Sequence, residues 1–174
     1  MMDRSVILLD VDGVINAVRP HLPPMPWDDF TETRSGNGFP IFWSRKMIDR
    51  LAGFDADIVW LTTWEDVANR YICPIIGWEP REFISPSRRW AFESWWKADA
   101  AQRYLAANPR PLVWLDDDVE WSENEGHIPW LRHYPVPYLL LAPDCEHGLT
   151  PGQLDLVETF IAEHGKIDPD ERTN

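Results

Sequence analysis

The sequence predicts an α/β fold: a doubly wound parallel sheet with helices on both faces. Two observations lead to this prediction. Four short apolar runs each stop at a small or polar residue, as fully buried strands do. Stretches with helical spacing of apolar residues separate most of these runs, and strands that alternate with helices build parallel sheets from βαβ units.

The four apolar runs are the expected strands, and the residues that follow them bear on function. The runs cover residues 5–9, 56–61, 111–115 and 137–141. The first three lead into Asp10, Thr62 and Asp116. Ligands of open parallel sheets bind beyond the carboxyl ends of the strands, so we expect these three polar side chains to converge on one edge.

Helices are expected between the strands, and two of them have clear start signals. The expected helices span residues 44–53, 64–71, 94–108 and 150–165. Ser44 can cap the first helix, whose apolar residues share one face. Thr150 followed by Pro151 gives the last helix a cap residue and a proline at its first position.

Two stretches fall outside the alternation of strands and helices. Residues 19–40 hold five prolines and two glycines, which favours a long loop or flap. Residues 119–135 are expected to be irregular, and residues 168–174 to form a frayed tail. The length of 174 residues predicts one domain, over residues 1–167.

The charge balance limits the partners of the protein. Sixteen Lys and Arg residues against 29 Asp and Glu residues give a net charge of −13. This charge repels anionic membranes and argues against non-specific binding of long nucleic acids. A local cluster of donors with a metal can still act at contact distance. The expected partner is therefore a phosphorylated small molecule or a short nucleic acid end.

The cysteines and the first apolar run indicate the compartment. Cys73 and Cys145 are the only cysteines, and neither has the spacing of a zinc ligand or of a disulfide framework. The apolar run at residues 6–9 is too short for a signal sequence or a membrane span. We therefore expect a cytoplasmic protein with no membrane partner.

Asp10 and Asp12 stand two residues apart where a strand ends. One carboxylate can attack a phosphoryl group while the other protonates the leaving oxygen and then deprotonates water. Gly13 allows a sharp turn after them. A calcium loop that starts at Asp10 is excluded, because its fifth and twelfth positions hold Val14 and His21. Plain turn chemistry remains the alternative.

Three further features could complete such a site. Residues 116–118 are three aspartates, which repel one another unless a cation such as Mg²⁺ offsets their charge; the alternative is an acidic surface loop. Thr62, backed by Thr63, offers a hydroxyl, although threonine there is commonly a helix cap. Lys97 is the only lysine between Thr62 and these aspartates, although lysine on a helix is commonly a solvated charge.

In their order along the chain, these residues resemble the four motifs of the haloacid dehalogenase (HAD) superfamily. The resemblance implies the Rossmann-like fold of that family, with Asp10 as the nucleophile that forms an aspartyl-phosphate. Asp12 would be the general acid/base, as in the phosphatase branch. Thr62 and Thr63 would bind the phosphoryl group, and Lys97 would neutralise its charge together with that of Asp10.

The same resemblance implies a Mg²⁺ site. Asp10, the backbone carbonyl of Asp12, Asp116 and Asp117 would hold the ion, whose charge makes the attack of one anion on another feasible. Three aspartates in a row leave the register open, so Asp118 is an alternative to Asp117.

Two features bear on the substrate. The segments between the motifs are short, so the protein resembles capless or minimally capped members, with residues 19–40 as the flap or minimal cap. Trp-Leu-Thr-Thr-Trp at 60–64 and Trp-Leu-Asp-Asp-Asp at 114–118 resemble a small HAD subgroup of RNA-repair systems. Trp64 and residues 88–90, Arg-Arg-Trp, could contact a nucleic acid end, or they could pack and be solvated.

The expected function is Mg²⁺-dependent hydrolysis of a phosphomonoester, with a nucleotide or a phosphorylated nucleic acid end as substrate. Two alternatives share the same residues: a non-catalytic module that binds phosphate, and a phosphotransferase with an acceptor other than water. A phosphorelay receiver domain is excluded by order, because its acidic pair precedes the phosphorylated Asp, and its Thr and Lys come last.

Overall fold

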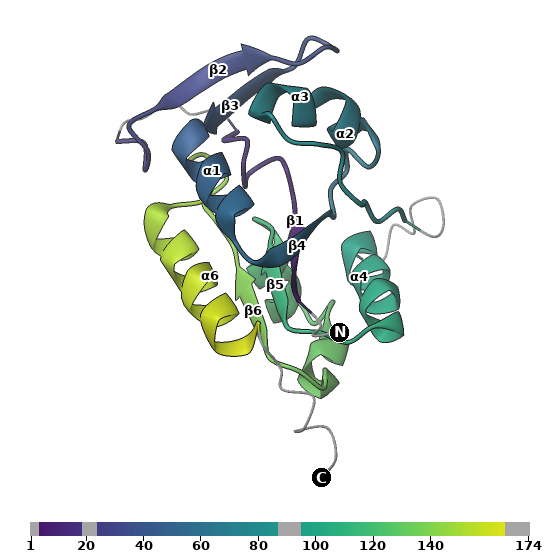
Figure 1. Cartoon of the computed structure of the whole chain (residues 1–174). Coiled ribbons are helices and arrows are strands. Elements are labelled where there is room, and N and C mark those ends of the chain that lie inside the picture. The colour runs from purple at the N-terminus through teal and green to yellow at the C-terminus, as the bar shows by residue number, and fades with distance from the viewer. Residues whose placement is uncertain (1–3, 19–23, 87–94, 166–174) are drawn as a thin grey trace.

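The computed structural model describes residues 4–18, 24–86 and 95–165, and its centre is a four-stranded parallel sheet (Figure 1). The strands are β1 (Ser5–Leu9), β4 (Ala56–Trp60), β5 (Leu112–Leu115) and β6 (Tyr138–Leu141), in the spatial order β4-β1-β5-β6. All three neighbouring pairs are parallel. The four expected strands are thus confirmed to within one residue at each end.

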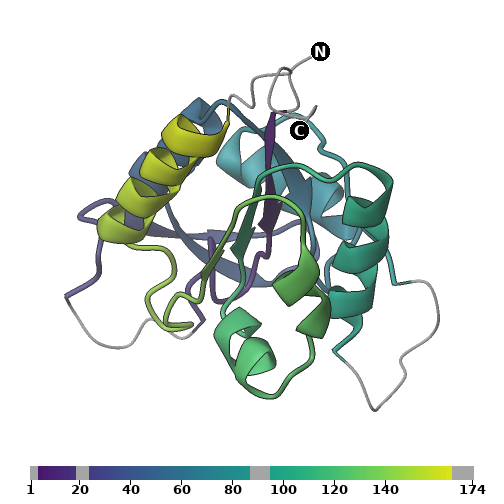
Figure 2. The same cartoon turned by 90° about the horizontal axis from the view of Figure 1, so that it is seen from below.

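Helices cover both faces of this sheet (Figure 2). Ile7 and Leu9 of β1 pack against α1 (Arg45–Gly53) and α6 (Pro151–His164). Val6 and Leu8 face the other way, toward α4 (Trp96–Ala107) and α5 (Val119–Asn124). Because both faces are covered, every residue of β1 is buried, and the strand is a continuous apolar run rather than an alternating one. The predicted doubly wound fold is confirmed.

The two helix starts expected from the sequence have the expected caps. The Ser44 hydroxyl accepts a hydrogen bond from the Met47 backbone N–H at 3.1 Å. Thr150 and Gln153 form a reciprocal capping box, in which each side chain accepts from the backbone N–H of the other, at 3.2 and 3.0 Å. Each cap satisfies N–H groups that the first turn of a helix leaves without partners.

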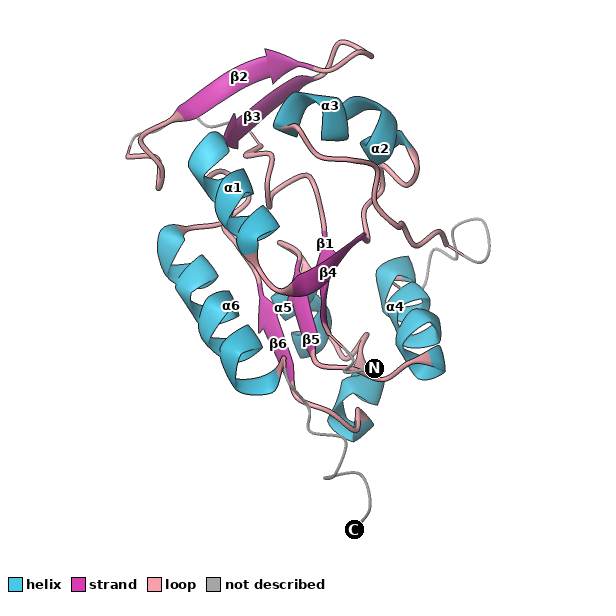
Figure 3. Cartoon of the chain, in the orientation of Figure 1, coloured by secondary structure: helices cyan, strands magenta, loops and turns pink. Residues whose placement is uncertain are grey.

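The flap expected over residues 19–40 is in part a β-hairpin, so the prediction of a loop is wrong there (Figure 3). Its antiparallel strands are β2 (Phe30–Arg34) and β3 (Pro40–Ser44). Aromatic and β-branched residues in both strands favour extended structure and outweigh the prolines, which cluster before β2 and at the first residue of β3. Residues 19–23 of the expected flap lie outside the described part of the chain.

Short helices account for the other differences. The stretch 119–135, expected to be irregular, contains α5 and a 3-10 helix (Pro129–His133). The helix expected at 64–71 begins only at α2 (Val67–Tyr71), and α3 (Cys73–Ile76) follows with a proline in its first turn. Helices of one or two turns bury too few apolar residues for a recognisable period. The expected tail at 168–174 lies outside the described residues.

The hairpin and the pair α2–α3 lie beyond the ends at which β1 and β4 finish (Figure 1). Backbone and side-chain bonds tie the hairpin to the turn after β1: the Ala17 N–H donates to the Phe42 carbonyl at 2.9 Å, and the Phe42 N–H donates to the Asn16 side chain at 2.8 Å. The carboxyl edge of the sheet is therefore bordered by two inserted segments. No helix in the described ranges has the length and apolar character required to span a bilayer.

Candidate active site

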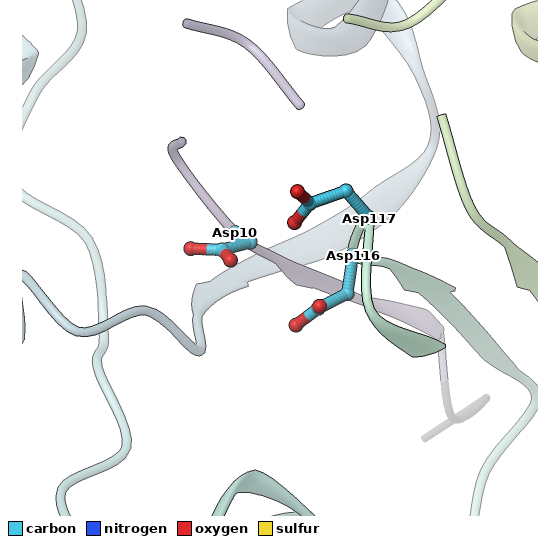
Figure 4. A group of neighbouring side chains, drawn as sticks. All are labelled: Asp10, Asp116 and Asp117. Atoms are coloured by element: carbon cyan, nitrogen blue, oxygen red, sulfur yellow. The ribbon is translucent and has the colours of Figure 1, made fainter. Parts of the chain in front are cut away.

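Three carboxylates meet at the carboxyl edge of the sheet, as Figure 4 shows. Asp10 follows β1, and Asp116 and Asp117 follow the neighbouring strand β5. The Asp10 N–H donates to the Leu115 carbonyl at 3.0 Å, which holds the two strand ends side by side. One carboxylate oxygen from each of the three aspartates lies within 4.8 Å of the others. The convergence expected from parallel strands brings these residues together.

Lys97 reaches the same cluster from the first turn of α4. Its Nζ lies 2.5 Å from Asp10 Oδ2 and 2.6 Å from Asp116 Oδ2. The residue is only 4% exposed, so the solvated-charge alternative does not describe it. The side chain points inward because the start of α4 packs against the sheet, a placement that its spacing along the sequence did not determine.

One ammonium group among three carboxylates leaves an excess of negative charge. Burial raises the pKa of Asp116 to about 7, and the Asp10 charge adds to this effect, while Lys97 opposes it. Burial and the charges of Asp10 and Asp118 raise the pKa of Asp117 to about 6. Burial also raises the pKa of Asp10, against the lowering effects of Lys97 and of hydrogen bonds from Thr62 and Val11.

The Lys97 ammonium has the opposite balance. Burial alone would lower the pKa of Lys97, but the charges of Asp10 and Asp116 and their hydrogen bonds outweigh it and raise that pKa. The lysine is therefore charged, and it still cannot neutralise three carboxylates. A cluster of hard oxygen donors with surplus negative charge has the chemistry of a Mg²⁺ site. The residues present fit that ion.

The structure places Asp117, rather than Asp118, in the cluster. Asp118 is exposed and is the N-cap residue at which α5 begins, and its backbone N–H donates to Asp116 Oδ1 at 3.0 Å. Gly13 has a φ of +75°, and a Cβ there would collide with the Asp117 carboxylate. Glycine at this position thus serves both the turn and the close approach of Asp117.

The side chains of Thr62 and Thr63 lie in different environments, although the two residues are adjacent in sequence. Thr62 is 1% exposed, and its hydroxyl is close enough to Asp10 to lower the pKa of that carboxyl by hydrogen bonding. The same hydroxyl accepts from the Trp64 backbone N–H at 3.3 Å. Thr63 is exposed and lines a neighbouring pocket instead. Of the two hydroxyls, only that of Thr62 lies at the Asp10 carboxylate.

The Asp12 carboxylate lies outside the three-carboxylate cluster and is half-buried. Trp64 Nε1 donates to its Oδ2 at 2.8 Å, and Asn16 Nδ2 donates to its Oδ1 at 2.7 Å. Trp64 is followed by Glu65, whose φ of +47° is rare outside glycine. Two donors thus fix the orientation of Asp12, one from the turn after β1 and one from the segment after β4.

The sequence did not indicate these two partners of Asp12. Trp64 stands out in the sequence only as a ring that could stack on a ligand, and Asn16 does not stand out, since an asparagine in a turn has no distinctive pattern. Asn16 also accepts from the Phe42 N–H, so it joins the Asp12 carboxylate to the hairpin. The stretch 88–90, considered above for contacts with nucleic acid, lies outside the described residues.

A pocket of about 370 Å³ opens beside Asp12. Asn37, Phe39 and Pro40 of the hairpin form one side, and Thr63 and Trp64 form another. Asp12, two residues after Asp10 of the acidic cluster, lines this pocket, and so does Thr63, the residue after Thr62.

A comparison of the sequence with protein-family models gives a match. The sequence matches, over residues 6–150, the model of a family described as HAD domain in Swiss Army Knife RNA repair proteins. The matched residues include the full set of motifs and the described site, which confirms the resemblance predicted from those motifs. A search of curated proteins finds no match.

Proposed function

The chain belongs to the family of HAD domains in Swiss Army Knife RNA repair proteins, and from this premise we propose that it is a Mg²⁺-dependent phosphomonoester hydrolase. Its substrate in this proposal is a nucleotide or a phosphorylated nucleic acid end. The observation that carries the proposal is the buried contact of Lys97 with Asp10 and Asp116, with Asp117 completing an acidic cluster.

Asp10 acts as the nucleophile in this proposal. A carboxylate oxygen forms a bond to phosphorus while the bond from phosphorus to the leaving oxygen breaks, and Asp12 donates its proton to that oxygen. The resulting aspartyl-phosphate on Asp10 is then hydrolysed. Asp12 takes a proton from water, the water oxygen bonds to phosphorus, and the bond to Asp10 breaks to release inorganic phosphate.

In this proposal Lys97 and Thr62 stabilise the negative charge of the phosphoryl group. The Lys97 ammonium stays charged beside Asp10, and the buried Thr62 hydroxyl is a donor at the same edge. Donors already in place where charge develops lower the barrier without reorganising during the reaction. Asp10, Asp116, Asp117 and the Asp12 carbonyl would hold Mg²⁺, which when bound offsets the charge of both anions.

Asp12 is suited to proton transfer because its carboxylate is not part of the three-carboxylate cluster. The hydrogen bonds from Trp64 and Asn16 hold it at the wall of the pocket described above. A general acid must lie within reach of the leaving oxygen, which in this proposal occupies the space between Asp10 and Asp12.

The test is hydrolysis of a generic aryl phosphate by the wild-type protein and by Asp10→Asn, each with Mg²⁺ and with EDTA. We expect turnover that requires Mg²⁺ and that falls by more than about a thousandfold in Asp10→Asn. Asp118→Asn is the matched control, because it makes the same change on an exposed neighbour of the cluster. Turnover that survives in Asp10→Asn would exclude the mechanism.

Two other outcomes would point to the alternatives. Phosphate released to an added alcohol in preference to water would indicate a phosphotransferase, which shares the first half-reaction. No turnover of aryl phosphates, nucleotides or phosphorylated oligonucleotides, together with tight binding of a phosphate analogue, would indicate a non-catalytic phosphate-binding module.

A further inference from the structure

We propose that the pocket beside Asp12 binds the planar base of the nucleotide that carries the scissile phosphate. This inference rests on the proposed function and names the part of the substrate that the protein selects. The pocket is lined by the hairpin and by the segment that leads into α2. Figure 3 shows these two insertions beyond the carboxyl edge of the sheet.

Two aromatic rings form adjacent walls of this pocket. The rings of Phe39 and Trp64 have centroids 6.0 Å apart and planes inclined by 77°. A flat ring can stack on one of these side chains and meet the other at its edge, and both are favourable aromatic arrangements. Phe39 is 59% exposed, a large exposure for a phenylalanine, and a stacked ligand would cover it.

The position of Asp12 identifies the occupant as the leaving group. Asp12 lines the pocket, and Trp64, which forms a wall, donates to its carboxylate at 2.8 Å. In the proposed mechanism Asp12 protonates the leaving oxygen, so the atoms attached to that oxygen extend into this space. In the same mechanism the phosphoryl group itself is bound by Asp10 and Lys97, neither of which lines the pocket.

The charge of the lining favours an uncharged ring over a second phosphate. Among the described residues that line the pocket, Asp12 is the only charged one. A phosphate or a polyphosphate would meet no cation there, whereas a base would meet aromatic faces and two amides. The Asn16 amide already bonds to Asp12 and to the hairpin backbone. The other amide is that of Asn37, whose Oδ1 accepts from the Ser35 hydroxyl at 2.5 Å, so its nitrogen is oriented by a protein contact.

The hairpin tip that carries Phe39 is internally braced. The Ser35 N–H donates to the Phe39 carbonyl at 2.8 Å. A Cβ at Gly36 would lie 2.8 Å from the Tyr71 ring, so the tip packs closely on α2. Both walls are therefore held in place without a ligand, which reduces the ordering that binding would otherwise require.

The experiment measures binding to Asp10→Asn, which prevents turnover, in the presence of Mg²⁺. Titration calorimetry compares adenosine 5′-monophosphate and adenosine 3′-monophosphate with ribose 5-phosphate, which lacks a base. We expect at least one nucleotide to bind roughly tenfold or more tightly than ribose 5-phosphate, the scale of one base stacked on an aromatic side chain. Adding Phe39→Ala should clearly lower this ratio, although the Trp64 wall remains, while Phe39→Trp should preserve it.

Phe83→Ala is the matched control, because Phe83 is also exposed, at 38%, and does not line the pocket. That variant should keep the ratio. Equal binding of nucleotide and ribose phosphate, no binding of either, or a ratio that persists in Phe39→Ala would overturn the base subsite. A ratio that depends on Phe39, together with a wild-type protein that shows no phosphatase activity, would support the base subsite and reject the proposed hydrolase.

Discussion

The carboxyl edge of the sheet and the hairpin beside it differ in almost every physical respect. At the edge, Asp116 is fully buried and follows a strand of the parallel sheet, and Lys97 is 4% exposed and belongs to a helix packed on that sheet. On the hairpin, Phe39 is 59% exposed and lies at the tip. A buried, charged edge therefore suits the proposed phosphoryl chemistry, which is the same for many substrates. An exposed insertion suits selection among those substrates.

The two regions meet at Asp12. Its carboxylate accepts hydrogen bonds from Trp64, in the segment after β4, and from Asn16. The Asn16 side chain also accepts a hydrogen bond from the Phe42 N–H of the hairpin. A change in the hairpin can therefore reach Asp12, the proposed general acid, through one asparagine. We therefore expect large effects on stability and rate from changes at the carboxyl edge. Changes at the hairpin and the pocket should have smaller effects that depend on the substrate.

The largest effect is expected for Lys97→Met. This change leaves Asp10 and Asp116 buried without their cation, and breaking a buried pair costs roughly 3–5 kcal/mol of unfolding free energy. Loss of the charge at the phosphoryl group should also lower kcat about a hundredfold or more. The loss of stability should be smaller at pH 5, because the raised pKa values let the carboxylates become neutral.

Denaturant unfolding at pH 8 and pH 5, with kinetics at pH 8, measures both effects. Lys46→Met is the control, since Lys46 pairs with Asp28 at 2.6 Å on the surface and should be replaced without a detectable change in unfolding. Similar small losses in both variants would mean that the buried contact does not differ from a surface ion pair.

A second prediction concerns pH and Mg²⁺. In the folded, metal-free protein the pKa values of Asp116 and Asp117 are raised to about 7 and about 6, above the values near 4 of an unfolded chain. The folded state then binds more protons, so its stability should fall as pH rises through 6 to 7. Because a metal needs ionised carboxylates, Mg²⁺ should bind at least about tenfold more tightly at pH 8 than at pH 5.5.

Thermal unfolding at pH 5.5 and pH 8, with and without Mg²⁺, measures how Mg²⁺ binding and stability depend on pH. The increase in Tm on adding Mg²⁺ should be larger at pH 8. Asp117→Asn should reduce both this increase and its dependence on pH, whereas Asp118→Asn, at the exposed neighbour, should leave them close to wild type. An increase of equal size at the two pH values would contradict the assignment of the cluster.

The smallest effect is expected for Trp64→Phe, which keeps an aromatic wall and removes the donor to Asp12. The kcat/KM for an alkyl phosphate, which reports the first half-reaction and whose leaving oxygen needs protonation, should fall roughly tenfold. The kcat/KM for p-nitrophenyl phosphate should change little, since that leaving group departs without a proton. A purely structural role of Trp64 would lower both rates together, and Trp121→Phe, at a residue 53% exposed, provides the background.

Local sequence patterns predict much of the fold and part of the site. The four strands and the caps Ser44 and Thr150 follow from such patterns, and they agree with the structure because buried parallel strands and helix starts depend mainly on adjacent residues. The hairpin does not follow from them, because prolines dominate the composition of its surroundings. Its pairing depends on packing beside Asn16 rather than on a turn signal alone.

The chemical groups at the ends of the strands follow from local sequence: Asp10 after β1, Thr62 near the end of β4, and Asp116 after β5. The distant side chains that complete the site depend on tertiary packing. Lys97 reaches Asp10 across 87 residues and Trp64 reaches Asp12 across 52, and the turn after β5 selects Asp117 over Asp118. Local patterns record what neighbours along the chain favour, whereas these contacts exist only once helices and insertions pack around the sheet.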